Sequence, residues 1–172
     1  MKLKATGLLI TALTVLTACS LQQKQHQAQQ QSRFNQHVDA EGLISIEELQ
    51  TNYPIFNAGS GYQPVKASIE SFNATTASTD IKVFLGTWCH DSQREVPRLI
   101  KFYNSINNPR VTLTMVALDR SKNDSNGLAQ QAEVRYTPTI ILYQDNQELG
   151  RIIEQSDGPI DVQLANMLPR QK

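Results

Sequence analysis

Cys89, in the segment Trp-Cys-His-Asp-Ser at residues 88–92, is the side chain of this sequence best suited to nucleophilic chemistry. A cysteine thiolate attacks disulfides, and a helix N-terminus favours the thiolate because its unpaired amides and dipole attract negative charge. The mostly apolar residues 81–85 before the segment predict a buried strand, and the residues after it predict a helix. We therefore predict a reactive thiol at a strand-to-helix turn, with a small buried core residue as the alternative.

The residues beside Cys89 could tune the thiol or present it to a partner. Protonated His90 would add positive charge, whereas Asp91 would act the other way or simply cap the helix. Ser92 could hydrogen-bond the thiolate or only fill its site. We expect Trp88 to form a partly exposed contact surface next to the thiol, with core packing as the alternative.

Residues 136–139, with the sequence Tyr-Thr-Pro-Thr, stand directly before an apolar stretch that predicts another strand. Pro138 cannot donate to a β-ladder, so it belongs at the start or the edge of a strand. The bond between Thr137 and Pro138 is also a candidate for a cis peptide. We interpret this segment as the second half of the site.

Together these segments resemble the thioredoxin superfamily over about residues 81–167, and most closely its exported or lipid-anchored members. The resemblance rests on Trp88-Cys89 at a helix start, on Pro97 eight residues after the cysteine, and on Thr137-Pro138 before a strand. It implies a thioredoxin-like α/β fold in which a central mixed β-sheet is flanked by helices and followed by a C-terminal β-hairpin plus helix. It also implies that the loop at Thr137 and Pro138 faces Cys89 and, with Trp88, binds the substrate.

Two residues depart from the family pattern. Ser92 stands where the resolving cysteine of a two-cysteine enzyme would attack the mixed disulfide. Val83 stands where thioredoxins carry a buried acid that helps to deprotonate that second cysteine. The two departures agree with each other, and they predict that Cys89 forms mixed disulfides that an external thiol must resolve.

The favoured function is therefore a monothiol thiol–disulfide oxidoreductase. Its partners would be disulfide- or thiol-containing envelope proteins or a glutathione-like small thiol. The alternative is a redox-inactive binding module that holds envelope proteins in the same groove. A one-cysteine peroxidase is less favoured, because residues 86–89 lack the proline-containing loop of peroxiredoxins. We expect no cofactor, and no metal site because His26 and His37 have no neighbouring ligand cluster.

Residues 1–18 predict a lipoprotein signal peptide. A basic start at Lys2 and Lys4 precedes an apolar run that is too short to span a bilayer. The run ends in Leu-Thr-Ala-Cys at residues 16–19, which resembles a bacterial lipobox and implies that Cys19 carries a lipid with acyl chains such as palmitate. In that family Ser20 after the cysteine implies the outer membrane, facing the periplasm, if the host is Gram-negative. An ordinary signal peptide that contains a cysteine is the alternative.

We expect residues 19–38, which are polar and rich in glutamine, to be a flexible tether, with a helical stalk as the alternative because Gln and Ala tolerate a helix. Residues 39–172 are expected to form one thioredoxin-like domain. Removal of the signal peptide leaves 14 basic and 16 acidic side chains. The mature protein therefore has no basic field that would attract nucleic acid. Attachment to the envelope membrane would depend on the lipid alone.

Periodicity and turn signals predict the elements of this domain. A capping box at residues 45–48 opens a short helix, and Asp145-Asn146 turns a hairpin. The other expected elements are helices at 65–72, 89–106, 126–134 and 160–167 and strands at 81–85, 111–118, 139–143 and 149–153. This order predicts a mixed sheet with helices on both faces. We expect Arg94 and Glu95 on a solvated helix face.

Overall fold

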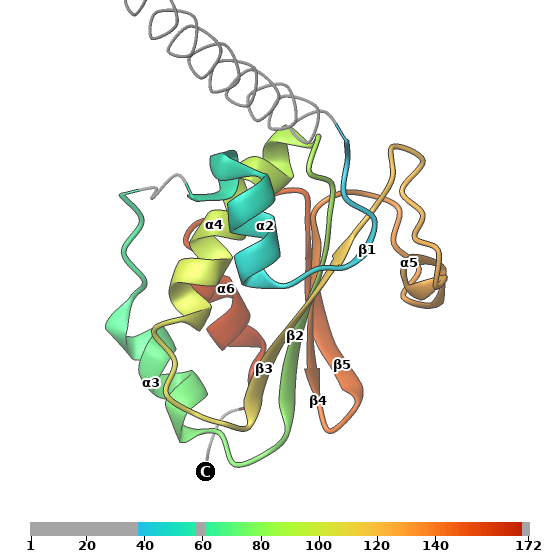
Figure 1. Cartoon of the computed structure of the whole chain (residues 1–172). Coiled ribbons are helices and arrows are strands. Elements are labelled where there is room, and N and C mark those ends of the chain that lie inside the picture. Colours follow the sequence, from blue (N-terminus) through green and yellow to red (C-terminus); the bar gives the residue numbers. More distant parts are fainter. Residues whose placement is uncertain (1–37, 58–60, 170–172) are drawn as a thin grey trace, which may run out of the picture. The chain divides into compact units, whose positions relative to one another are not determined.

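Strands and helices alternate along the residues that the computed structural model describes, 38–57 and 61–169. The expected signal peptide, Cys19 and all but the last residue of the expected tether lie outside them. The elements in Figure 1 are β1 (Gly42–Leu43), α2 (Ile46–Asn52), η1 (Pro54–Asn57), α3 (Lys66–Ala74), β2 (Thr79–Leu85), α4 (His90–Tyr103), β3 (Val111–Ala117), α5 (Leu128–Gln131), β4 (Thr139–Gln144), β5 (Gln147–Ile153) and α6 (Ile160–Met167). Each helix in this part of the chain is too short or too polar to cross a bilayer.

The strands of the described residues form one five-stranded sheet in the order β1-β3-β2-β4-β5. β2 runs parallel to β3 and antiparallel to β4, while β1 and β5 pair antiparallel with β3 and β4. Val83 lies between Met115 and Ile140, so β2 is the central strand. The predicted mixed sheet with its C-terminal hairpin and helix is confirmed. The turn toward Cys89 leaves from the buried end of this central strand.

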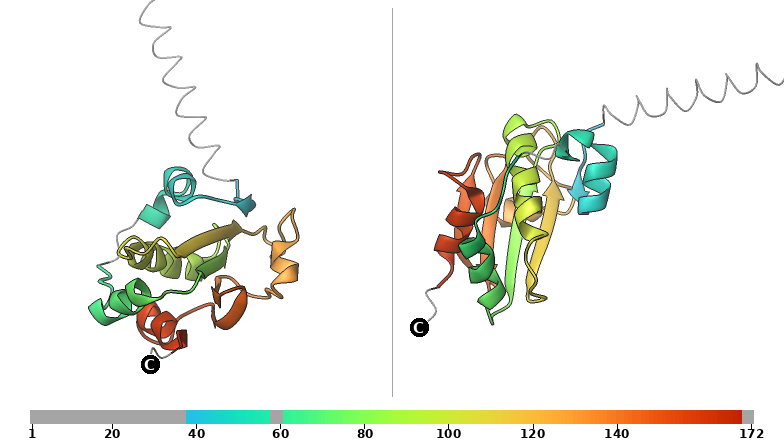
Figure 2. Two further views of the ribbon diagram at one scale, coloured as in Figure 1. Left: turned by 90° about the horizontal axis from the view of Figure 1, so that it is seen from below. Right: turned by 90° about the vertical axis from the view of Figure 1, so that its left-hand side faces the viewer.

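The two faces of the sheet are covered unequally. Ile81, Val83 and Leu85 belong to the larger core cluster, which also takes residues from α2, α3, α4 and α6. Phe84 points to the opposite face, where a smaller cluster includes Ala129 of α5. Figures 1 and 2 show α5 on the side of the sheet away from the other helices. Helices on both faces are confirmed, but among the described residues the second face carries only a four-residue helix.

Two helices are shorter than predicted. α4 ends at Tyr103 and not at Ile106, because residues 105 and 106 donate to carbonyls three positions earlier, in a tighter turn. α5 covers four residues instead of 126–134. Gly127 before it has φ 69° and Glu133 after it has φ 53°, and these left-handed residues delimit the helix.

The capping box of α2 and the hairpin turn between β4 and β5 are both present, as predicted. Ser45 Oγ accepts the Glu48 amide at 3.1 Å and Glu48 Oε2 accepts the Ser45 amide at 3.0 Å, so the capping box opens α2. Asp145 and Asn146 have φ of 49° and 66°, as a tight hairpin between β4 and β5 requires. Both predictions succeeded because the residues that define each feature lie within a few positions of one another.

Candidate functional site

Cys89 is the N-cap residue of α4, directly after the turn that follows β2, as predicted. Its amide donates to the Gly86 carbonyl oxygen at 3.0 Å, and its carbonyl oxygen accepts the Gln93 amide at 2.9 Å. The thiol is half-buried. It therefore lies at a helix end that attracts negative charge and remains open to a partner on one side.

The loop before β4 meets this thiol. Cys89 Sγ donates to the Thr137 carbonyl oxygen at 3.0 Å, and the Thr137–Pro138 bond is cis, as predicted. The Pro138 carbonyl oxygen accepts the Glu154 amide at 2.8 Å, which ties the loop to the end of β5. The structure thus brings Cys89, Thr137 and Pro138 together, although their distance in sequence is about fifty residues. Their roles in binding a substrate stay predictions.

Ser92 supports the turn from inside the domain. It is fully buried, and its Oγ accepts the Gly86 amide at 3.1 Å. This contact shows that Ser92 packs inside the turn, and because its oxygen only accepts here, a hydrogen bond from its hydroxyl to the thiolate stays a prediction. The residue at the position of the missing second thiol thus fixes the strand-to-helix turn that presents Cys89.

His90 and Asp91 occupy the first turn of α4. His90 is exposed, as a residue beside an open site would be. Asp91 Oδ1 pairs with Arg94 Nη1 at 2.7 Å, and its carboxylate lies where the helix dipole favours negative charge. Within the described ranges, no three His, Cys, Asp or Glu side chains gather as a metal site would need.

Trp88 is half-buried and is held from three directions. Its Nε1 donates to the Leu118 carbonyl oxygen at 3.1 Å, and the Arg120 guanidinium carbon lies 5.8 Å from the ring centroid. A Cβ at Gly86 would lie only 2.7 Å from Trp88 Cε2, so the ring packs closely on the turn. Trp88 is therefore packed on one part and exposed on another, and its role as a contact surface for a partner stays a prediction. The sequence gives no local signal for Arg120, which lies more than thirty residues away.

The expectation that Glu95 lies on a solvated face is wrong. Glu95 is 1% exposed, and its Oε1 accepts from Arg94 Nε at 2.7 Å and from Arg98 Nη1 at 3.3 Å. Ser156 donates to its other oxygen at 3.2 Å. Glu95 stands three residues after buried Ser92 and four before buried Leu99, and this spacing places it on the inner face of α4. The flanking arginines make burial of the charge possible.

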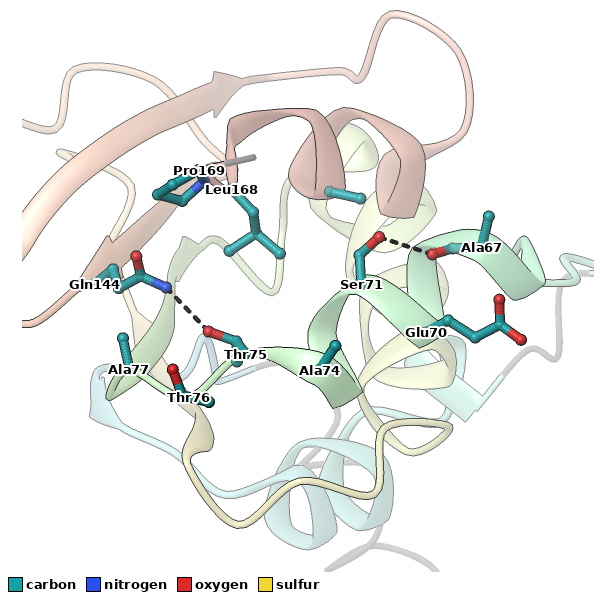
Figure 3. Close-up of a pocket in the computed structure, with 11 residues that line it drawn as sticks. Ala67, Glu70, Ser71, Ala74, Thr75, Thr76, Ala77, Gln144, Leu168 and Pro169 are labelled. Atoms are coloured by element: carbon teal, nitrogen blue, oxygen red, sulfur yellow. Dashed lines mark hydrogen bonds between the residues drawn. The ribbon is translucent and has the colours of Figure 1, made fainter. Parts of the chain in front are cut away.

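A pocket of about 690 Å³ lies away from the thiol, between α3, the end of α6 and the residues that lead into β2. Figure 3 shows small side chains along it, among them Ala67, Ser71 and Ala74. Cys89 follows the opposite end of β2, so this pocket is not part of the thiol site. The chemistry of Cys89 and the Thr137 loop, and not the pocket, identifies the candidate site.

Comparison with family models identifies the family of this chain. The family model described as Thioredoxin matches residues 63–168, more than half of the chain. This range includes Cys89, Ser92, Thr137 and Pro138. No curated protein matches the sequence.

Solved structures with a similar fold include several thioredoxins. A protein of unknown function from Pseudomonas aeruginosa is 17% identical, with 63% of this chain and 64% of that chain covered and a TM-score of 0.45. Trxlp from Edwardsiella tarda is 22% identical, with 62% and 97% covered and a TM-score of 0.43. Thioredoxin-2 of the malaria parasite is 22% identical, with 54% and 85% covered and a TM-score of 0.44.

Proposed function

Because the chain belongs to the thioredoxin family, we propose that it is a thiol–disulfide oxidoreductase that works with one active cysteine, Cys89. The observation that carries the proposal is the 3.0 Å contact between Cys89 Sγ and the carbonyl oxygen of Thr137. It sets a half-buried thiol at a helix N-terminus against the backbone of a loop in which Thr137 and Pro138 are buried and Tyr136 is 49% exposed. Ser92 in place of a second thiol supports the single-cysteine form of the reaction.

The reaction is an exchange of disulfides. The Cys89 thiolate attacks one sulfur of a substrate disulfide, a new sulfur–sulfur bond forms, and the other substrate sulfur leaves as a thiolate. An external thiolate then attacks the substrate sulfur of this mixed disulfide and releases the Cys89 thiolate. One disulfide has replaced another and no electrons are gained or lost overall. Trp88 would contact the partner, and Thr137 and Pro138, which are buried in the resting domain, would pair with it once the loop is uncovered.

We also propose that the protein works in the bacterial cell envelope, anchored by a lipid on Cys19. The residues that support this lie outside the described part of the chain, so the support comes from the signal-like sequence before Cys19. The partners would be envelope proteins with thiols or disulfides, or a glutathione-like small thiol. In a Gram-negative host the domain would face the periplasm from the outer membrane.

Trapping of mixed disulfides tests the exchange reaction. Cells that make the full chain are quenched in acid, free thiols are blocked, and adducts are compared on non-reducing gels. We expect adducts with the wild type and none with Cys89→Ala, because no other thiol of the domain can replace Cys89. Ser71→Ala, on α3 and away from the site, is the matched control and should keep them. A wild-type Cys89 that stays free in cells and does not react with oxidised glutathione in vitro would contradict the proposal.

A redox-inactive binding module is the second candidate, and Ser92 is the observation that favours it. Its hydroxyl is buried in the turn and cannot resolve a mixed disulfide. A module of this kind would use the surface of Trp88, Thr137 and Pro138 without turnover at Cys89. Capture of the same envelope partner by wild type and by Cys89→Ala would support this function, whereas loss of the partner with Cys89→Ala would support exchange.

A further inference from the structure

The start of the described chain reaches the turn that presents Cys89. The Ala40 amide donates to Thr87 Oγ1 at 3.2 Å, and Thr87 is 5% exposed two residues before the thiol. Asp39 Oδ2 accepts from Arg120 Nε at 2.7 Å. Figure 1 shows this segment entering next to the end of β3 from which the Arg120 loop departs. Two segments that are distant in sequence therefore contact the same turn.

Tyr53 joins this cluster from the end of α2. Burial raises the pKa of Tyr53 and the Asp39 carboxylate raises it further, while a hydrogen bond with the Thr87 side chain lowers it. The Tyr53 hydroxyl is thus close to both Asp39 and Thr87. The turn before Cys89 therefore lies against polar groups from the first part of the domain, and the ring of Tyr53 also packs against the larger apolar core.

Arg120 connects this cluster to Trp88. The side chain of Arg120 is 72% exposed, and without a partner a long exposed arginine would sample many positions. The ion pair with Asp39, whose side chain is 28% exposed, restricts the guanidinium to the face of the Trp88 ring. The Trp88 ring is also held by its hydrogen bond to the Leu118 carbonyl oxygen and by its close packing on Gly86.

We propose that Asp39 and Arg120 are positioning residues for Cys89. Asp39 orients the Arg120 side chain, and Arg120 holds the Trp88 ring and the adjoining turn in place. This inference rests on the proposed exchange function of Cys89. Neither residue touches the thiol, so both act through Trp88 and the turn.

Trp88 makes this testable, because the sequence contains one tryptophan and its fluorescence reports on the ring alone. In the full chain, we expect Asp39→Asn and Arg120→Gln to raise acrylamide quenching of Trp88 about twofold. We expect the exchange of Cys89 with oxidised glutathione to slow about threefold, the size expected for loss of an exposed ion pair and a cation–π contact. Arg120→Lys keeps the charge and should recover at least half of both changes.

Glu70→Gln is the matched control, since it removes a carboxylate from an exposed ion pair with Lys66 on α3. It should leave quenching and exchange at wild-type values. Unchanged quenching in Asp39→Asn and Arg120→Gln would overturn the inference, and so would higher quenching with an unchanged exchange rate. A wild type that does not exchange at all would instead refute the proposed function, whatever the quenching shows.

Discussion

Gly86 determines how closely the Trp88 ring approaches the turn before Cys89. A Cβ at this position would lie 2.7 Å from Trp88 Cε2 and 2.9 Å from Cζ2, which is closer than such atoms pack. We expect Gly86→Ala to displace the indole and to lower the free energy of unfolding by about 1–3 kcal/mol, as overpacking does. Urea denaturation followed by Trp88 fluorescence measures both effects. Gly61→Ala is the control, because a Cβ there meets nothing within 4 Å, and equal stability of the two variants would contradict the argument.

Glu95 is a buried charge whose partners are two half-exposed arginines. Its side chain is 2% exposed, against 39% for Arg94 and 34% for Arg98. Removal of the carboxylate would leave two neighbouring guanidiniums without their shared partner and a gap on the inner face of α4. We expect Glu95→Ala to lower the free energy of unfolding by about 2–3 kcal/mol, below the full cost of a fully buried pair because water reaches both arginines.

Thermal and urea unfolding measure this loss. Glu70→Ala is the matched control, since its partner Lys66 is 90% exposed, and the change should stay within about 0.5 kcal/mol. A Glu95→Ala variant as stable as Glu70→Ala would show that the arginine cluster adds nothing to the fold.

At the scale of elements, the N-terminus of α4 determines what kind of exchange the domain can perform. Cys89 is its N-cap and Ser92 lies one turn further on, in the position of a resolving thiol. We expect Ser92→Cys to close an internal disulfide with Cys89 on oxidation and to reduce the adducts trapped in cells. The reduced variant should lose about 1 kcal/mol of stability, because the hydroxyl that accepts the Gly86 amide is gone.

Thiol titration of the oxidised and reduced protein measures the new disulfide. Ser71→Cys supplies a second thiol on α3, away from the site, and should leave the adducts of Cys89 unchanged. If oxidised Ser92→Cys kept two titratable thiols in the domain, the two side chains would be held too far apart for the proposed geometry.

The elements themselves were largely predictable, because their signals are local. The capping box at Ser45 and the hairpin at Asp145-Asn146 depend on residues a few positions apart, and both are present. The cis bond before Pro138 and the helix start at Cys89 were also predicted. The contact of Arg120 with Trp88 was not, since the two residues come from different segments. The burial of Glu95 was missed although its spacing from Ser92 and Leu99 and its neighbours Arg94 and Arg98 are local, because a charged residue is expected on the solvated face. The predicted length of α5 was wrong, because left-handed residues at Gly127 and Glu133 delimit the helix and its composition does not reveal them.

At the scale of the whole molecule, Tyr62 and Asp161 join the segment before α3 to the start of α6. The Tyr62 hydroxyl donates to Asp161 Oδ1, and the Val65 amide donates to Oδ2 at 2.8 Å. The Arg98 guanidinium carbon lies 5.8 Å from the Tyr62 ring centroid, so α4 takes part in the same contact. One tyrosine thus links three elements that cover the same face of the sheet.

Alkaline pH should weaken this link. Burial, and then the hydrogen bond to Asp161, raise the pKa of Tyr62 far above its usual value. Tyrosine in the unfolded chain ionises near pH 10, so the folded state holds its proton where the unfolded state has lost it. The stability from this proton is complete below about pH 10 and declines as the pH rises above it. Urea unfolding at pH 8 to 11 should show the decline, with a shallower slope for Tyr62→Phe; equal slopes would contradict this.

The hydrogen bond between Ser92 and the Gly86 amide also affects timing. In a two-thiol enzyme the protein itself decides how long a partner stays attached, because release is an internal step. In this domain the residue at the position of the resolving thiol is Ser92, whose hydroxyl oxygen accepts the Gly86 amide. If Cys89 exchanges as proposed, the residence time of each partner becomes a readout of the thiol concentration around the protein. The rate at which the domain releases a partner would then be set by the external thiols and not by the domain itself.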